Sequence, residues 1–145
     1  MTMAVDDAPV VLVVDDDPDL RDLFAMLLGD EFCARVVGTG DPAEALRLAR
    51  GLRPTLVLMD LVRTGRGPAF CAALRAEPAT RDIPVLVVTA ASPACPDGAK
   101  LAARCDAWIA KPFDLDGLFD AIRRYLPPGA PCAGNSRSYS ARMSR

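Results

Sequence analysis

Short apolar runs that alternate with segments of helical spacing constrain the fold of this 145-residue chain more than any other feature. Four runs have the length of a buried strand, namely residues 10–14, 56–59, 85–88 and 107–110. A fifth run, at residues 34–37, predicts a short, half-exposed strand at the edge of a sheet. Strands that alternate with helices in this way predict an α/β fold, with one parallel sheet covered by helices on both faces.

The segments between the runs carry the usual signals for the start and the end of a helix. Asp17-Pro18 and Asp41-Pro42 each place an acid at the capping position and a proline in the first turn. We expect the second of these helices to end at Gly51. The last helix should begin after the acid at position 114 and end at the proline pair 127–128. Two further helices are expected at about residues 68–75 and 96–104.

Polar side chains stand at the carboxyl ends of the apolar runs. Asp15 and Asp16 follow the first run, Asp60 follows the second, Thr89 the third and Lys111 the last. In a parallel sheet with right-handed crossovers these ends meet at one edge, where ligands of such sheets bind. Clustered carboxylates are costly there unless a cation binds, and their oxygens suit Mg²⁺. A carboxylate can also accept a phosphoryl group, while an ammonium and a hydroxyl can bind its oxygens.

The composition excludes several classes of function. The chain has no histidine, so histidine-based acid–base catalysis, phosphotransfer and metal binding are excluded. A net charge of −2 gives no field that would recruit nucleic acid or an anionic membrane. No signal peptide or membrane span is visible, and we expect a cytoplasmic protein. The five cysteines lack metal-site spacing and are expected to be unpaired, small apolar side chains.

Four motifs resemble the receiver domain of bacterial two-component response regulators. They are Val-Val-Asp-Asp-Asp-Pro at 13–18, Leu-Val-Leu-Met-Asp at 56–60, Val-Val-Thr-Ala at 87–90 and Asp-Ala-Trp-Ile-Ala-Lys-Pro-Phe at 106–113. The resemblance covers residues 9–126 and implies a flavodoxin-like, doubly wound, five-stranded parallel sheet of order 2-1-3-4-5 with five helices. Residues 1–8 are then a short flexible N-terminus. Residues 127–145, rich in Pro, Gly, Ala and Ser, are expected to be a disordered tail.

The same resemblance implies roles for the residues at the carboxyl edge of the sheet. Asp60 is similar to the phosphoacceptor of the family. Asp16 is similar to the main ligand of a Mg²⁺ cofactor, with Asp15, Asp60 and the backbone carbonyl of Val62 as further ligands. The loop that follows, residues 61–68, departs from the Pro-Gly-x-Asp-Gly pattern common in the family, so its shape is not implied by the resemblance.

Three further residues take roles from the resemblance. Thr89 is similar to the switch hydroxyl that moves toward the phosphoryl group, and Trp108 stands at the position of the gating aromatic residue. Lys111 is similar to the lysine that contacts the phosphoryl group. The resemblance also implies a cis bond between Lys111 and Pro112.

The implied function is a stand-alone phosphoacceptor switch rather than an enzyme. Phosphate would come from a sensor histidine kinase or a phosphotransfer protein. Output would pass through an unknown downstream protein, a phosphorelay or a phosphorylation-dependent homodimer, without direct DNA or membrane binding. One alternative is a pseudo-receiver that binds proteins independently of phosphate. Another is a haloacid dehalogenase-type phosphohydrolase, whose Asp-x-Asp motif Asp15 and Asp17 formally satisfy, although its other motifs are missing.

Overall fold

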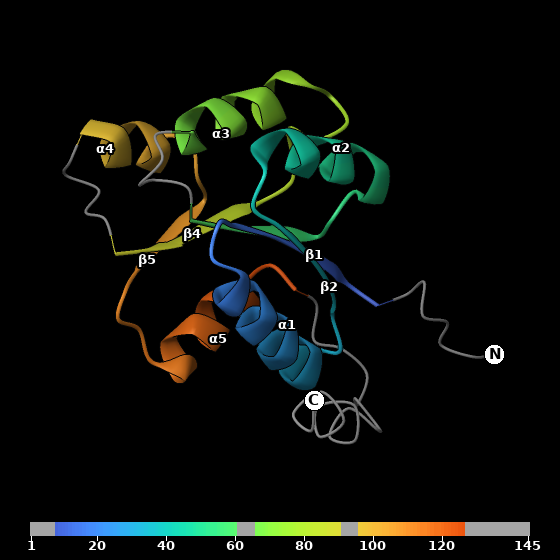
Figure 1. The fold of residues 1–145 in the computed structure, drawn as a ribbon, viewed down its shortest axis with the longest axis vertical. Coiled ribbons are helices and arrows are strands. Elements are labelled where there is room, and N and C mark those ends of the chain that lie inside the picture. Colours follow the sequence, from blue (N-terminus) through green and yellow to red (C-terminus); the bar gives the residue numbers. More distant parts are fainter. Residues whose placement is uncertain (1–7, 61–65, 91–95, 127–145) are drawn as a thin grey trace.

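The computed structural model describes residues 8–60, 66–90 and 96–126, without the side chains of residues 97, 98 and 101. Five described strands form one parallel sheet in the order β2-β1-β3-β4-β5, as the resemblance implied (Figure 1). The strands are β1 (Val10–Asp15), β2 (Arg35–Thr39), β3 (Leu56–Asp60), β4 (Val85–Thr89) and β5 (Ala107–Ala110). The half-exposed strand β2 lies at the edge of the sheet, as its sequence predicted.

The helices of the described chain are divided between the two faces of this sheet. They are α1 (Pro18–Phe32), α2 (Pro42–Leu52), α3 (Gly67–Ala76), α4 (Pro96–Ala102) and α5 (Leu115–Arg123). Helices α1 and α5 cover one face, and α2, α3 and α4 lie on the other (Figure 1). The doubly wound arrangement expected from the alternating pattern is therefore confirmed.

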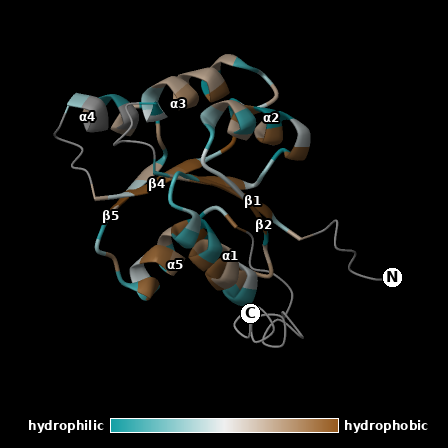
Figure 2. Ribbon diagram, viewed as in Figure 1, coloured by the Kyte–Doolittle hydropathy of each residue, from teal (hydrophilic) through white to brown (hydrophobic). Residues whose placement is uncertain are grey.

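Side chains on opposite faces of the strands build two separate parts of the core. On one face, Val11 of β1 packs in a cluster with Phe24 of α1 and Leu118 of α5. On the other face, Leu12 packs in a second cluster that includes Phe70 of α3. The central part of the sheet between the helices is hydrophobic (Figure 2). Burial of both faces explains why β1, β3 and β4 are continuously apolar, whereas the edge strands β2 and β5 are more exposed.

The helices begin where the capping signals predicted. The carboxylates of Asp17, Asp41 and Asp114 each accept a hydrogen bond from a backbone N–H of the first turn, at 2.9, 3.2 and 2.9 Å respectively. Such bonds satisfy N–H groups that have no partner within the helix. Because α1 begins directly beyond β1, its cap at Asp17 also fixes the turn that follows the acidic end of that strand.

The ends of two helices differ from the sequence expectation. Helix α2 passes through Gly51 and ends at Leu52, so the predicted end at Gly51 is wrong. Arg53 instead takes the left-handed conformation, with φ of 48°, and its N–H bonds to the carbonyl of Ala49 at 3.0 Å. Helix α5 ends at Arg123, and turns replace it before the proline pair is reached. Helix ends thus depend on local backbone geometry that glycine and proline positions do not fully specify.

The cysteines agree only in part with the expectation that all five are unpaired. Cys71 and Cys105 are free. Burial raises the pKa of the Cys71 thiol to about 12, which suits an inert side chain in the core. Cys33, at the left-handed end of α1, is disulfide-bonded, so for this residue the expectation is wrong.

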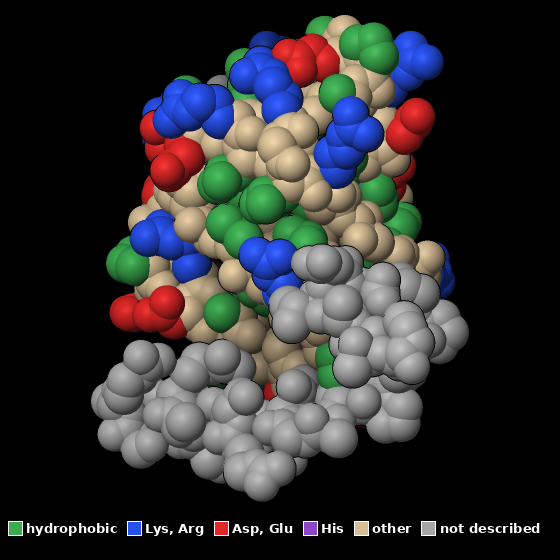
Figure 3. All heavy atoms as spheres, turned by 90° about the vertical axis from the view of Figure 1, so that its right-hand side faces the viewer, with side chains coloured by type: hydrophobic (Ala, Val, Ile, Leu, Met, Phe, Trp, Pro, Cys, Tyr) green, Lys and Arg blue, Asp and Glu red, His purple; other side chains and the backbone are tan. Residues whose placement is uncertain are grey.

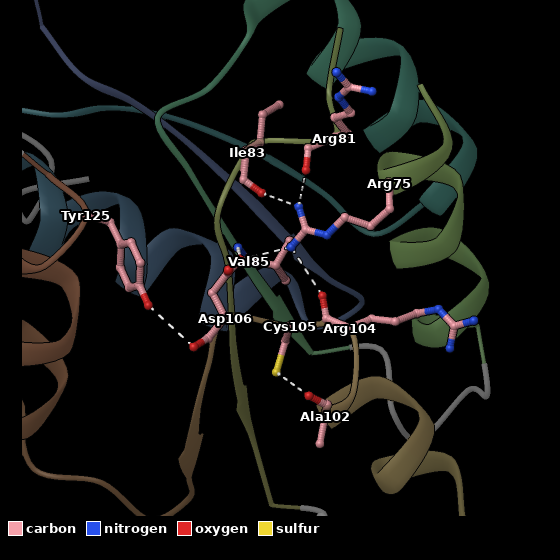
Figure 4. A network of polar contacts seen from close by, with 9 residues as sticks. All are labelled: Arg75, Arg81, Ile83, Val85, Ala102, Arg104, Cys105, Asp106 and Tyr125. Carbon is pink, nitrogen blue, oxygen red and sulfur yellow. Dashed lines mark hydrogen bonds and ion pairs between the residues drawn. The ribbon is translucent and has the colours of Figure 1, made fainter. Parts of the chain in front are cut away.

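A network of polar contacts joins α3 to the ends of β4 and β5 that lie away from the acidic edge (Figure 4). The Arg75 guanidinium donates to the carbonyls of Arg81, Ile83 and Arg104, at 2.8, 2.7 and 3.2 Å. It also pairs with the Asp106 carboxylate at 2.9 Å. These contacts tie one helix to three loop carbonyls and to the start of β5.

The described helices and one face of the molecule bear on contacts with membranes and with charged partners. No described helix combines the length and apolar character needed to cross a bilayer. Seen from the right-hand side of Figure 1, basic and acidic side chains are interspersed with hydrophobic ones (Figure 3). This distribution agrees with the small net charge of −2.

Candidate functional site

The carboxyl edge of the sheet brings together the polar side chains that end the strands. Asp15 ends β1 and Asp60 ends β3, and the strand register pairs these two residues directly. Thr89 ends β4 and is paired with Ala110, the last residue of β5. Lys111 follows immediately. The parallel order thus assembles in space what the sequence distributes over nearly a hundred positions.

Asp60 and Lys111 form an ion pair at this edge. Lys111 Nζ donates to Asp60 Oδ2 at 2.9 Å, and the two side chains are 21% and 9% exposed respectively. The other carboxylate oxygen, Asp60 Oδ1, is buried and has no hydrogen-bond partner within the described part of the chain. A buried polar atom without a partner is costly, so it marks a position where a ligand would be favoured.

Asp15 is held beside this pair in a buried position, with 2% of its surface exposed. Its Oδ1 accepts the N–H of Asp17 at 2.9 Å. Burial raises the pKa of the Asp15 carboxyl, against the lowering effect of the Asp17 hydrogen bond. The negative charges of Asp60 and Asp16 raise this pKa further, and Lys111 lowers it. Ionisation of Asp15 beside the other carboxylates is therefore unfavourable, and a bound cation would offset the repulsion between their charges.

Asp16 and Asp17 occupy different environments although they are adjacent. Asp16 is exposed where the chain leaves β1, whereas Asp17 caps α1. Among the described residues, no group of three or more histidine, cysteine, aspartate or glutamate side chains is arranged to hold a metal ion. Mg²⁺ commonly retains several waters and needs only one or two carboxylates. The carboxylates of Asp60 and of the buried acid Asp15 fit such a site. The predicted ligand Val62 lies outside the described residues.

The predicted switch residues lie on β4 and β5. Thr89 is fully buried, and its carbonyl accepts the N–H of Lys111 at 2.9 Å. The bond between Lys111 and Pro112 is cis, as the resemblance implied. Trp108 is half-buried and packs against the core on the side of α2 and α3, with its indole Nε1 buried and unpartnered in the described structure.

Comparison with known proteins identifies the family to which this chain belongs. The sequence profile of the response regulator receiver domain matches residues 11–123. The chain belongs to the response regulator receiver family. It is 36% identical over 118 residues to the DNA-binding response regulator MtrA of Mycolicibacterium smegmatis, covering 80% of this chain and 50% of MtrA. It is 32% identical to RpaA of Synechocystis, covering 81% of this chain and 49% of RpaA. This receiver domain therefore spans about half the length of these relatives.

Solved receiver structures show the same fold. The chemotaxis response regulator CheY4 of Vibrio cholerae is 28% identical, with a TM-score of 0.70 over 82% of this chain and 99% of CheY4. The receiver domain of the sensor histidine kinase PA1611 of Pseudomonas aeruginosa is 26% identical, with a TM-score of 0.68 over 81% of this chain and 97% of that domain. That structure holds a magnesium ion in its active-site cleft. Phosphorylation on aspartate and Mg²⁺ binding are general features of receiver domains.

One residue beside the acidic edge was not found from the sequence. Arg21, at the end of the first turn of α1, donates from Nη1 to the backbone carbonyl of Asp15 at 2.7 Å. The sequence contains a possible signal, an arginine six positions after the end of a strand on the helix that follows it. However, helical spacing alone gives no reason for an arginine to turn back toward the strand rather than toward solvent.

Proposed function

We propose that this receiver domain is a phosphoacceptor switch that takes a phosphoryl group on Asp60 with the help of Mg²⁺. The observation that supports the proposal most strongly is that the two carboxylate oxygens of Asp60 have different surroundings. Oδ2 is held by Lys111 at 2.9 Å, while Oδ1 is buried without a described partner. A carboxylate oriented in this way offers one oxygen for bonding to an incoming group.

In the proposed reaction, a carboxylate oxygen of Asp60 attacks the phosphorus of a phosphohistidine on a sensor kinase or a phosphotransfer protein. The new bond joins this oxygen to phosphorus, and the bond from phosphorus to the histidine nitrogen breaks, with its electron pair returning to the ring. Lys111 is close enough to stabilise negative charge on a phosphoryl oxygen. Thr89, at the end of β4, is the proposed hydroxyl partner of the phosphoryl group. Movement of Thr89 toward that group would change the packing around Trp108.

Asp15, Asp16, Asp60 and the backbone carbonyl of Val62 are the proposed ligands of Mg²⁺. When bound, Mg²⁺ would neutralise charge on the transferring group and orient it. The role of the protein residues is to hold their oxygens at the strand ends, and for Asp15 the hydrogen bond from Asp17 does this. The chain itself is a phosphoacceptor that assists its own reaction, rather than an enzyme that turns over a separate substrate.

We propose that the phosphorylated domain signals by binding another protein or by passing the phosphate on in a relay. MtrA and RpaA are described as DNA-binding, and this chain spans about half of each. Because the match covers only about half of each relative, DNA binding is not carried over to this chain. Because the chain belongs to the receiver family, we do not propose the haloacid dehalogenase-type phosphohydrolase as its function.

Intact-protein mass spectrometry after incubation with acetyl phosphate and MgCl₂ tests the proposal. We expect one phosphoryl adduct, formed as the acetate leaves, which disappears in EDTA and in the Asp60→Asn variant. A folded wild-type protein that forms no adduct would contradict the proposal and favour the pseudo-receiver, which binds proteins without using phosphate. An adduct that persists in Asp60→Asn would assign the acceptor to another residue.

A further inference from the structure

Arg21 contacts the acidic edge through the backbone rather than through a carboxylate. Its Nη1 lies 2.7 Å from the carbonyl oxygen of Asp15, a distance typical of a charge-assisted hydrogen bond. The side chain of the same aspartate is fixed separately, because its Oδ1 accepts the N–H of Asp17 at 2.9 Å. Asp15 is therefore held at two points, one on its carboxylate and one on its backbone.

The sheet itself leaves this carbonyl without a strand partner on one side. The ladder between β1 and β3 continues to the pair Asp15–Asp60. The ladder between β1 and β2 ends one residue earlier, at the pair Val14–Thr39. The Arg21 guanidinium occupies the position beside Asp15 that a longer β2 would have filled.

Two glycines give the Arg21 side chain its path to this position. A Cβ atom at Gly38 would lie 3.1 Å from Cδ of Arg21, and its three nearest atoms would all belong to that side chain. A Cβ atom at Gly40 would lie 3.0 Å from Nη1 of Arg21 and 3.3 Å from the Asp15 carbonyl oxygen. The end of β2 is thus shaped to let the arginine cross it closely.

We propose that Arg21 is a positioning residue for the metal-binding edge, with Gly38 and Gly40 as the path that lets it act. By holding the Asp15 carbonyl, it fixes the backbone that carries the side chains of Asp15 and Asp16. This inference rests on the proposed function, since Mg²⁺ is the ligand whose binding it would support. It assigns residues of α1 and β2 a role in supporting the Mg²⁺ site.

The sign of the effect on Mg²⁺ affinity separates positioning from simple electrostatics. A guanidinium near the site repels a divalent cation, so charge alone predicts that removing Arg21 strengthens Mg²⁺ binding. Loss of positioning predicts the opposite, since removing a group that orients metal ligands commonly weakens binding by about 10–100-fold. A purely structural role would lower the free energy of unfolding and leave the affinity of the folded protein unchanged.

The test is a Mg²⁺ titration of the full chain followed by ¹H–¹⁵N NMR spectra, which report both the dissociation constant and the integrity of the fold. We expect Arg21→Ala to raise the dissociation constant about tenfold or more, and Arg21→Lys to recover part of the loss. Gly38→Ala should also weaken binding, because its methyl group would lie 3.1 Å from Cδ of Arg21 and push that side chain by a few tenths of an ångström. Arg47→Ala, on the exposed surface of α2, removes the same charge and should leave the affinity unchanged.

A double-mutant cycle connects the two sites. In an Arg21→Ala background, Gly38→Ala should have no further effect on Mg²⁺ affinity, because the side chain that it displaces is already gone. Additive effects, or unchanged or tighter binding in Arg21→Ala and Gly38→Ala while the wild type binds Mg²⁺, would overturn this inference and leave the proposed function standing. A folded wild-type chain that binds no Mg²⁺ would overturn both.

Discussion

The Lys111 side chain has two opposing effects at the carboxyl edge of the sheet. Its ammonium holds Asp60 Oδ2 at 2.9 Å and is the proposed partner of the phosphoryl group, yet its charge repels a metal ion. We therefore expect Lys111→Met to slow phosphorylation by acetyl phosphate about a hundredfold, the usual cost of losing one charge-stabilising group. The same variant should bind Mg²⁺ as tightly as the wild type or more tightly.

The two quantities are measured by timed intact-mass spectra and by NMR titration with Mg²⁺. Lys100→Met provides a matched control, because it removes an exposed lysine from the last turn of α4. If Lys111→Met loses Mg²⁺ affinity and phosphorylation in the same proportion, Lys111 has a structural role and the assignment to the phosphoryl group is wrong.

Asp15 should make the stability of the metal-free protein depend on pH. Burial raises its pKa above the usual 3.8, so the folded state binds the proton more tightly than the unfolded state. Its contribution to stability is then fully present below the unfolded pKa and is lost as the pH rises through the folded pKa. At neutral pH the ionised carboxylate destabilises the fold in the absence of a cation.

Asp15→Asn removes this ionisation. In EDTA at neutral pH we expect the variant to be more stable than the wild type by about 0.5–2 kcal/mol, the usual gain from relieving a strained functional site. The difference should shrink toward acid pH, where Asp15 of the wild type becomes protonated. Urea denaturation over a pH series measures this. A variant that is less stable than the wild type in EDTA at neutral pH would show that burial of the charge is not the dominant effect.

Residues that act through their chemistry at strand ends could be predicted, and residues that act through geometry could not. Asp15, Asp60 and Lys111 each follow an apolar run, so the parallel arrangement alone places them together. Arg21 acts through a backbone carbonyl across a gap left by Gly38, and neither its charge nor its spacing indicates that contact. It depends on where β2 ends relative to β1, which is a property of the assembled sheet.

At the scale of elements, helix starts could be predicted more accurately than helix ends. Asp17, Asp41 and Asp114 cap the helices that follow them, because a carboxylate accepts the free N–H groups of a first turn whatever the tertiary context. The end of α2 lies one residue beyond the predicted Gly51, because Arg53 rather than Gly51 takes the left-handed conformation. Gly51 has open space around it, so its missing side chain places no constraint on the packing.

The connection between α3, β4 and β5 should depend strongly on Arg75. Its guanidinium bonds three backbone carbonyls and the Asp106 carboxylate, so Arg75→Ala removes four contacts at once and takes this donor from the part-buried carbonyl of Ile83. We expect this change to reduce the free energy of unfolding by about 2–3 kcal/mol. Phosphorylation of the folded variant should be close to that of the wild type, because the network lies at the end of the sheet away from Asp60.

Arg50→Ala is the matched control for this prediction. Arg50 pairs with Glu77 at 2.7 Å, but both side chains are exposed, at 47% and 34%. Exposed ion pairs contribute about 0–1 kcal/mol, so the control should lose far less stability in urea denaturation. Equal losses in the two variants would show that the contacts of Arg75 with the loop carbonyls contribute little.

At the scale of the whole molecule, the fold concentrates unfavourable charge at one edge of the sheet, and a ligand can recover the cost. The register places Asp15 opposite Asp60, and Lys111 compensates only part of their charge. We expect Mg²⁺ to stabilise the protein by mass action, by about 2.7 kcal/mol at a concentration about a hundredfold above its dissociation constant. Urea denaturation in MgCl₂ and in NaCl of equal ionic strength measures the gain, which should be much smaller in Asp60→Asn. An equal gain in both salts would show that the effect is general screening.

Asp60, rather than another acid of this edge, is the proposed acceptor of the phosphoryl group. The most direct measurement is reduction of the acetyl phosphate-treated protein with borohydride, which converts an aspartyl phosphate to homoserine, followed by peptide mapping by mass spectrometry. We expect homoserine at position 60, dependent on Mg²⁺ during phosphorylation. Homoserine at position 15 or 16, or its absence from a folded and Mg²⁺-loaded protein, would contradict it.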